Sequence, residues 1–146
     1  MANIVFQGPS ALTLDSKGRI AMPVRHRDVL ASMGAAKVTI TKNPPGGLLI
    51  FPPAAWDDFS ARVAALPMES AGWKRLFLGN AVEVEIDASS RVLVAPELRD
   101  FADLSRDVML LGMGNYFELW DSQRYADHEA RVMQSEMPES LKSFSF

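Results

Sequence analysis

Four basic residues, Lys17, Arg19, Arg25 and Arg27, occur within eleven positions near the start of this 146-residue chain. Residues 1–27 contain these four bases and one acid, Asp15, and so carry a formal charge of +3. Residues 28–146 contain 17 acids and 11 bases, a charge of −6, which brings the chain to −3. A local positive field on an acidic body directs a polyanion to one face. The chemistry that these residues predict is binding of a polyanion such as nucleic acid, and the alternative, which is the commoner one for such a segment alone, is a solvated charged surface.

The spacing of residues 15–19 (Asp-Ser-Lys-Gly-Arg) is typical of a tight loop between two strands. Apolar residues alternate on both sides of it, as in strands buried on one face. A three-residue loop closed by Gly18 in the left-handed region fits this length. The Asp15 carboxylate can accept bonds from the backbone of its own turn, and Arg19 can reach back to it. We therefore predict a rigid loop with Lys17 at its tip.

The predicted roles of the bases differ. We assign Lys17 and Arg25 to phosphate, with the loop residues Ser16 and Gly18 beside them. Arg19 has two possible roles: it reads a guanine edge, or it holds Asp15 and braces the loop. The same two alternatives apply to Arg27. The candidate DNA-binding residues are therefore Ser16, Lys17, Gly18, Arg19, Arg25 and Arg27.

The loop and its surroundings occur twice, 72 positions apart, which predicts an internal duplication. Asp15 and Arg19 correspond to Asp87 and Arg91, and together these four residues form the expected structural motif. The apolar and helical positions also match: Leu12 with Val84, Leu14 with Ile86, Ile20 with Val92, Met22 with Val94, and Arg27-Asp28 with Arg99-Asp100. The bracing role is favoured for Arg19 because Arg91 repeats it in a loop without a lysine.

The second copy lacks the charge of the first. Residues 17–27 hold four bases and no acid, whereas residues 89–99 hold two bases and Glu97, and Glu83, Glu85 and Asp87 precede them. Phosphates would be repelled by such a surface. We predict that the first copy contacts DNA and that the second supports the fold and the contacts between subunits.

The elements that must position these loops form an α+β fold that is mainly β, built from two β-hairpin–helix–β-hairpin repeats. In the first, residues 4–6 form a strand ended by Gly8-Pro9, residues 11–22 a hairpin, residues 24–33 a helix, and residues 37–41 and 48–51 a strand pair. The helix presents apolar positions 24, 29, 30 and 33 and ends at Gly34.

A connector of two antiparallel helices, over about 56–66 and 69–78, follows the first repeat, and its aromatic residues belong to the core. In the second repeat, residues 107–111 and 116–120 pair across a turn at 112–115. A final helix over 122–134 turns Tyr125, His128 and Val132 inward, and a mobile tail follows, whose Phe144 and Phe146 could dock on a neighbour. The predicted segments are 1–52 and 81–122 for the repeats, 53–80 for the connector, and 123–146 for the last helix and tail.

Composition excludes several classes of site. The chain has no cysteine, so disulfides and thiolate metal sites are impossible. His26 and His128 are the only histidines, and no Gly-x-Ser-x-Gly or His-Glu-x-x-His motif is present, so we predict no catalytic residue, no metal and no cofactor. His26 is interpreted as a surface histidine, with a weak phosphate contact as the alternative, and His128 as a core residue. A basic n-region and a membrane segment are both missing, so we expect a soluble cytoplasmic protein that needs no membrane and no small-molecule substrate.

The same residues resemble a known family. Phe6-Gln7-Gly8 with residues 14–23 (Leu-Asp-Ser-Lys-Gly-Arg-Ile-Ala-Met-Pro) is similar to the first motif of the MraZ bacterial transcriptional regulators. Residues 81–87 (Ala-Val-Glu-Val-Glu-Ile-Asp), Arg91-Val92 and residues 95–99 (Ala-Pro-Glu-Leu-Arg) are similar to its second motif. The second loop, Ala88-Ser89-Ser90, departs from the family in lacking the usual base and glycine.

The resemblance implies two swapped-hairpin units of the AbrB/SpoVT type, which form an intrachain pseudo-dimer barrel with flanking helices. It also implies a ring-like homo-oligomer, association with the nucleoid, and binding to promoter DNA upstream of the division and cell-wall gene cluster that begins with the family member's own gene. The alternative is an AbrB-type protein-interaction adaptor that does not read DNA, because one fold serves many functions.

Overall fold

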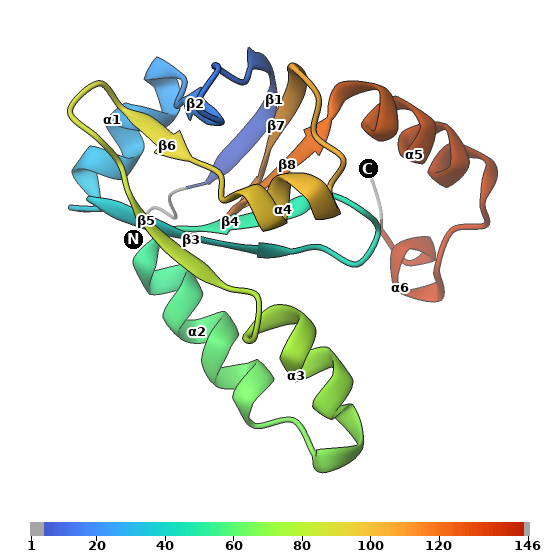
Figure 1. Ribbon diagram of the computed structural model, residues 1–146. Helices are drawn as coiled ribbons and strands as arrows, with labels where there is room; N and C mark the ends of the chain where they lie inside the picture. Colours follow the sequence, from blue (N-terminus) through green and yellow to red (C-terminus); the bar gives the residue numbers. More distant parts are fainter. Residues whose placement is uncertain (1–4, 145–146) are drawn as a thin grey trace.

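The computed structural model describes residues 5–144 and shows a mostly-β α+β fold with antiparallel sheets (Figure 1). Ile4, predicted as the start of a strand, and Phe146, predicted as a residue that could dock on a neighbour, lie outside these residues. The strands are β1 (Phe6–Thr13), β2 (Arg19–Ala21), β3 (Lys37–Lys42), β4 (Leu48–Phe51), β5 (Val82–Glu85), β6 (Arg91–Leu93), β7 (Asp107–Gly114) and β8 (Phe117–Asp121). The helices are α1 (Val24–Ser32), α2 (Pro53–Ala64), the 3₁₀ turn η1 (Met68–Ser70), α3 (Ala71–Phe77), α4 (Pro96–Phe101), α5 (Ser122–Gln134) and α6 (Glu139–Lys142).

The two repeats interleave. One sheet has the strand order β1-β7-β8-β4-β3-β5, and a separate two-stranded ribbon consists of β2 and β6. Each strand has a counterpart in the other repeat: β1 and β5, β2 and β6, β3 and β7, β4 and β8. When every strand is replaced by its counterpart, the strand order of the sheet and that of the ribbon stay the same, except that each is read in reverse. The strand pairing therefore has an internal two-fold symmetry, and each repeat completes the sheet of the other.

The prediction of hairpins over 11–22 and at the equivalent second position was wrong in one respect. The chain reverses at each loop, but β1 pairs with β7 and β2 with β6, rather than with each other. An isolated two-stranded hairpin is marginally stable in water. Pairing across the repeats buries Ile20, Met22, Val92 and Val94 completely in one shared core. Within residues 5–144 the strands form no closed sheet, because the six-stranded sheet ends at β1 and β5.

Strand β1 is longer than the sequence predicted. Gly8 and Pro9 do not end it but pair with Gly112 and Leu111 of β7. A proline is tolerated here because β1 is an edge strand, where a missing backbone N–H costs no ladder bond. Strand β7 likewise continues through the predicted turn to Gly114.

Helix α1 uses only part of the predicted face, because Leu30 is buried and Val29 packs against the core as predicted, but the other two positions do not. Val24 is 62% exposed and Met33 is also exposed, whereas His26 and Leu30 are buried. These two residues are four positions apart and therefore lie on the same side of the helix. The helix ends as predicted at Gly34, which has a φ of 69°.

The connector helices α2 and α3 lie side by side below the sheet (Figure 1). They cover a second apolar cluster of Leu49, Phe51 and Ala55, against which Trp56, Phe59, Phe77 and Tyr116 pack. The prediction that these aromatic residues belong to the core is confirmed for this set. Trp73 differs, because it is 54% exposed.

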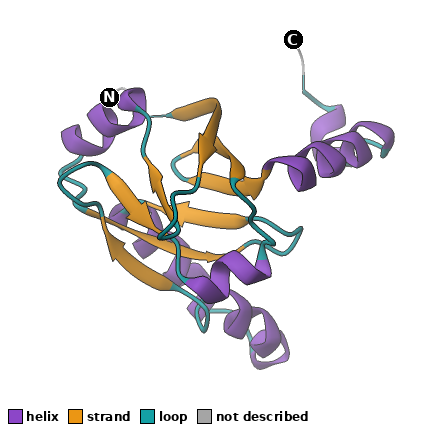
Figure 2. Ribbon diagram, turned by 45° about the horizontal axis from the view of Figure 1, so that its top comes forward, coloured by secondary structure: helices purple, strands orange, loops and turns teal. Residues whose placement is uncertain are grey.

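Helix α5 begins as predicted, with Asp121 accepting a bond from the Arg124 amide at 3.1 Å. Tyr125 and the half-buried His128 contact the Trp120 ring, with the His128 ring stacked at 4.8 Å. The inward orientation predicted for Val132 was wrong, because its side chain is 53% exposed. Figure 2 gives the reason: the helix extends away from the body, so only its first turns reach the sheet. The predicted tail contains the short helix α6.

No helix among residues 5–144 has the length and apolar character needed to cross a membrane.

Candidate nucleic-acid interface

The first loop is held by its own aspartate. Oδ1 of Asp15 accepts bonds from the backbone amides of Lys17 and Arg19, both at 2.9 Å, and Oδ2 accepts from Arg19 Nε at 2.7 Å. The Gly18 amide donates to the Asp15 carbonyl at 3.0 Å, and Gly18 has a φ of 82°. This geometry places the exposed Lys17 at the tip of a braced turn.

The second loop has the same framework without the lysine. Asp87 Oδ1 accepts from the amides of Ser89 at 2.8 Å and Arg91 at 2.9 Å, and Oδ2 accepts from Arg91 Nε at 3.3 Å. Ser90 takes the place of Gly18 and has a φ of 60°. The brace is thus independent of the charge at the tip.

The carboxylates of both loops titrate low. The bond from the Arg19 amide is the main cause that lowers the pKa of Asp15 to about 2, and the Arg19 side chain and the Lys17 amide lower it further. The bond from the Arg91 amide similarly lowers the pKa of Asp87. Each loop therefore keeps its aspartate ionised at neutral pH, where the neighbouring guanidinium offsets the negative charge.

The two loops lie at opposite ends of the β2–β6 ribbon. Arg19 is opposite Leu93 in the register, and Arg91 is opposite Ala21. Each loop is also bonded to the other repeat, since the Met22 amide donates to the Ser90 carbonyl and the Val94 amide to the Gly18 carbonyl, both at 2.9 Å. We call these the first end, beside residues 15–19, and the second end, beside residues 87–91.

Because the two repeats interleave, the arginine that follows each loop in the sequence, Arg27 or Arg99, lies at the end of the ribbon that holds the other loop. Arg27 Nε donates to the Met22 carbonyl at 2.6 Å, and its side chain lines a hollow with Ser90 at the second end. Its counterpart Arg99 donates to the Val94 carbonyl at 2.9 Å and lies against Gly18 at the first end. A Cβ on Gly18 would stand 2.6 Å from the Arg99 Cζ. Arg27 therefore does not lie with the loop that precedes it in the sequence.

Arg25 belongs to α1, and its side chain lies against strand β1. One of its terminal nitrogens, Nη2, donates to the Pro9 carbonyl at 3.0 Å and to the Ser10 hydroxyl at 2.9 Å. Thr13 is the last residue of β1, next to the first loop, and Pro9 stands four residues before it. At a strand rise of 3.3 Å per residue, the Arg25 contact at Pro9 is therefore about 13 Å from the loop end of β1. The bases of segment 17–27 thus do not all lie at the first end. The structure brings Ser16, Lys17, Gly18 and Arg19 together and separates Arg25 and Arg27 from them.

His26 was interpreted as a surface histidine, and this was wrong. It is 3% exposed, and its ring makes edge contacts with the rings of Phe6 at 5.7 Å and Phe117 at 4.9 Å. Burial lowers the pKa of His26, and the nearby charge of Arg25 lowers it further. The residue is part of the core.

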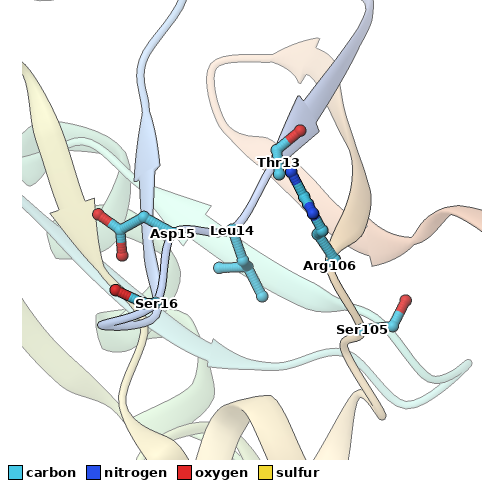
Figure 3. A pocket seen from close by; sticks show the side chains of 6 residues that line it. All are labelled: Thr13, Leu14, Asp15, Ser16, Ser105 and Arg106. Carbon is cyan, nitrogen blue, oxygen red and sulfur yellow. The ribbon is translucent and has the colours of Figure 1, made fainter.

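One basic residue at the first end was not predicted from the sequence. Arg106 lines an open hollow of about 680 Å³ with Thr13, Leu14, Asp15, Ser16 and Ser105 (Figure 3). Its carbonyl accepts the Leu14 amide at 2.9 Å, which joins it to the first loop across 92 positions of sequence. No local pattern marks this contact, because only the pairing of β1 with β7 creates it.

The first end is richer in bases than the second. At the first end Lys17, Arg19, Arg99 and Arg106 accompany Asp15, and the corresponding positions of the second end are Ser89, Arg91, Arg27, Ala36 and Asp87. These five matched positions carry +3 at the first end and +1 at the second. Among residues 5–144, no cluster of three or more His, Cys, Asp or Glu side chains is arranged to hold a metal ion.

Comparisons with known proteins agree with this duplicated arrangement. The sequence model of the family described as "MraZ protein, putative antitoxin-like" matches residues 5–75 and again residues 77–142. The chain is 65% identical to the transcriptional regulator MraZ of Methylibium petroleiphilum and 55% identical to that of Leptothrix cholodnii, in each case over all of both chains. It is also 55% identical to that of a Polaromonas species, over 97% of this chain and all of the relative. The names of these relatives describe regulators of transcription and not enzymes, and the chain belongs to the MraZ family.

Proposed function

We propose that this protein is a sequence-specific DNA-binding transcriptional regulator that contacts DNA through the first loop. The observation that carries the proposal is the placement of Lys17, exposed at the tip of a turn that Asp15 and Arg19 hold rigid. A rigid tip loses little conformational freedom on binding a phosphate. The names of the relatives support the same class of function.

The proposal assigns different tasks to the candidate residues. Lys17 neutralises a backbone phosphate, and Ser16 and Gly18 supply the loop that approaches it. Arg19 braces Asp15. Arg25 and Arg27 each donate to carbonyls of their own chain, so we assign them to the fold. Asp87 and Arg91 brace the second loop, whose tip carries no charge and does not bind DNA.

One loop alone would bind weakly, because each neutralised phosphate contributes only about −0.9 to the slope of log K against log salt. We propose that several subunits of a ring-like homo-oligomer present their first loops to repeated short sites, which raises the effective concentration of each loop. The target would be the promoter of the protein's own division and cell-wall gene cluster, bound by a nucleoid-associated cytoplasmic protein. Within each subunit the two interleaved repeats would act as an AbrB-like pseudo-dimer barrel.

A gel-shift assay tests the proposal. The full chain is mixed with its own upstream region and with a scrambled duplex of the same length, at 50 and 200 mM salt. A shift of the upstream region that survives competitor DNA and weakens steeply with salt is expected. Absence of a shift at low salt would reject DNA binding.

The second candidate is a protein-interaction adaptor. Exposed apolar side chains on the connector favour it, since Met68 is 90% exposed and Trp73 more than half exposed. These side chains also suit contacts between subunits. A chain that does not shift DNA but binds a partner through this surface would support the adaptor.

A further inference from the structure

The open hollow beside the first loop contains an arginine that the proposed function does not use. We propose that this hollow, with Arg106 as its base, is a second subsite for a DNA backbone phosphate, separate from the tip of the loop. The inference rests on the proposal that the first loop binds DNA. It adds a residue from the second repeat to a surface that the sequence assigned to the first repeat alone.

The backbone on both sides of Arg106 is fixed. Its carbonyl accepts the Leu14 amide at 2.9 Å, and the preceding residue, Ser105, donates from its amide and its hydroxyl to Asp121 Oδ1. Asp121 is also the N-cap of α5. Arg106 therefore stands on a braced segment next to a braced loop, and the separation of the two cations is set by the fold.

The Arg106 side chain is available to a ligand. Residue 106 is exposed, and among residues 5–144 its guanidinium makes no hydrogen bond or ion pair. In Figure 3 its side chain runs beside Thr13 on the wall of the hollow. Thr13 and Ser16 also line the hollow, and their hydroxyl groups are of a kind that can donate to a phosphate oxygen. The Ser105 hydroxyl cannot do so while it donates to Asp121.

The two nearest carboxylates do not cancel the charge of Arg106. Asp15 lines the hollow, but both its oxygens accept bonds from the loop, and Arg19 lies 2.7 Å from Oδ2. Asp107 follows Arg106 directly and is the first residue of β7, where it pairs with Thr13. Asp107 is not among the residues that line the hollow.

The second end provides an internal comparison. There the Ile86 amide donates to the Ala36 carbonyl at 2.9 Å, so that Ala36 occupies the place of Arg106. The hollow at that end is lined by Leu30, Ala31 and Ala35 as well as Ala36, and also by Arg27 and Ser90. Arg27 donates its Nε to the Met22 carbonyl, whereas the Arg106 guanidinium makes no hydrogen bond among residues 5–144. An arginine without a hydrogen bond at this position is therefore specific to the end that carries Lys17.

The groups in the hollow also define the class of ligand. One guanidinium and two hydroxyls suit the oxygens of a phosphodiester and do not distinguish between base pairs. Arg106 should therefore add affinity for any duplex. Losing one phosphate contact makes the slope of log K against log salt shallower by about 0.9. The ratio of the affinity at 50 mM salt to that at 200 mM salt should therefore fall about 3.5-fold for each engaged subunit.

The test compares Arg106→Ala with two controls in the full-length protein. Arg131→Ala removes an exposed arginine from α5 and has the same net charge. The double variant Arg106→Ala/Ala36→Arg restores the net charge but places the arginine at the second end. Affinity is measured by fluorescence anisotropy on the upstream duplex and on a scrambled duplex, from 50 to 200 mM salt, and thermal unfolding checks each fold.

We expect Arg106→Ala to weaken binding to both duplexes by the same factor and to reduce the salt slope, with Arg131→Ala unchanged and the double variant still weak. Wild-type affinity and slope in Arg106→Ala would overturn the inference. So would a loss on the upstream duplex alone, or recovery in the double variant. Failure of the wild type to bind either duplex at 50 mM salt would instead reject the proposed function itself.

Discussion

Exchanging the tip residues of the two loops tests whether the two ends of the ribbon differ in function. Lys17→Ser gives the first loop the residue of the second, and Ser89→Lys does the reverse. Both positions donate a backbone amide to the aspartate of their loop, at 2.9 Å for Lys17 and 2.8 Å for Ser89. A backbone bond does not depend on the side chain, so the braces should persist in both variants.

The magnitude follows from the number of loops that bind. Each lost lysine–phosphate contact lowers the salt slope by about 0.9, so the affinity ratio between 50 and 200 mM salt changes about 3.5-fold for one engaged loop and about 12-fold for two. The exposed Lys17 side chain makes no hydrogen bond or ion pair within residues 5–144, so the free energy of unfolding should change by less than about 0.5 kcal/mol. For a chain of this size that is less than about 2 °C in Tm.

The assay is anisotropy titration of the upstream duplex at four salt concentrations, with a melting curve for each variant. We expect Lys17→Ser to lose affinity and slope. Ser89→Lys should not restore them when combined with it, because Glu85 and Asp87 precede that tip and Ala36 replaces Arg106 there. An unchanged slope in Lys17→Ser, or full recovery in the double variant, would refute the reasoning.

Three further predictions concern stability. The lowered pKa of Asp15, about 2, makes its charged form stabilising above the unfolded value near 3.8, so the Tm difference between wild type and Asp15→Asn should shrink as the pH falls from 4 to 2. Gly18→Ala should cost about 1–3 kcal/mol, because φ is positive and a Cβ would meet Arg99, whereas Ser90→Ala, where a Cβ is already present, should cost less than about 0.5 kcal/mol in denaturant melts. Burial lowers the pKa of His26, so the unfolded chain binds more protons below pH 6.5, and wild type should lose more Tm between pH 7 and 5 than His26→Phe.

The loops were the most predictable part of the structure, because local rules determine them. An aspartate before a turn, an arginine four residues later and a glycine with positive φ specify each other within five residues. The 72-residue shift then applied the same geometry to the second loop, where Ser90 replaces the glycine. The start of α5 at Ser122 followed for the same reason, since the cap that Asp121 forms there depends on neighbouring residues alone.

The partners of the strands were not predictable from the residue pattern. Alternation shows that Ile20 and Val92 each face a core, but the pattern is the same whether a strand pairs within its repeat or across to the other. The swapped arrangement was implied only by the family resemblance. His26 was missed for a different reason: it stands among bases, and only its spacing of four from the buried Leu30 marks it as an inward position.

The pairing across repeats also changes how charge must be counted in this molecule. The segment 1–27 has a formal charge of +3, yet Arg27 lies at the second end and the Arg25 side chain lies against β1, so a sum over neighbouring residues does not give the charge of the first end. At the first end, Arg99 lies behind the loop and Arg106 beside it, and both come from the second repeat. A repeat whose own loop carries no lysine thus still contributes two of the four bases counted at the first end, Arg99 and Arg106. The first repeat could not reproduce that surface without its partner, since its own counterpart of Arg106 is Ala36.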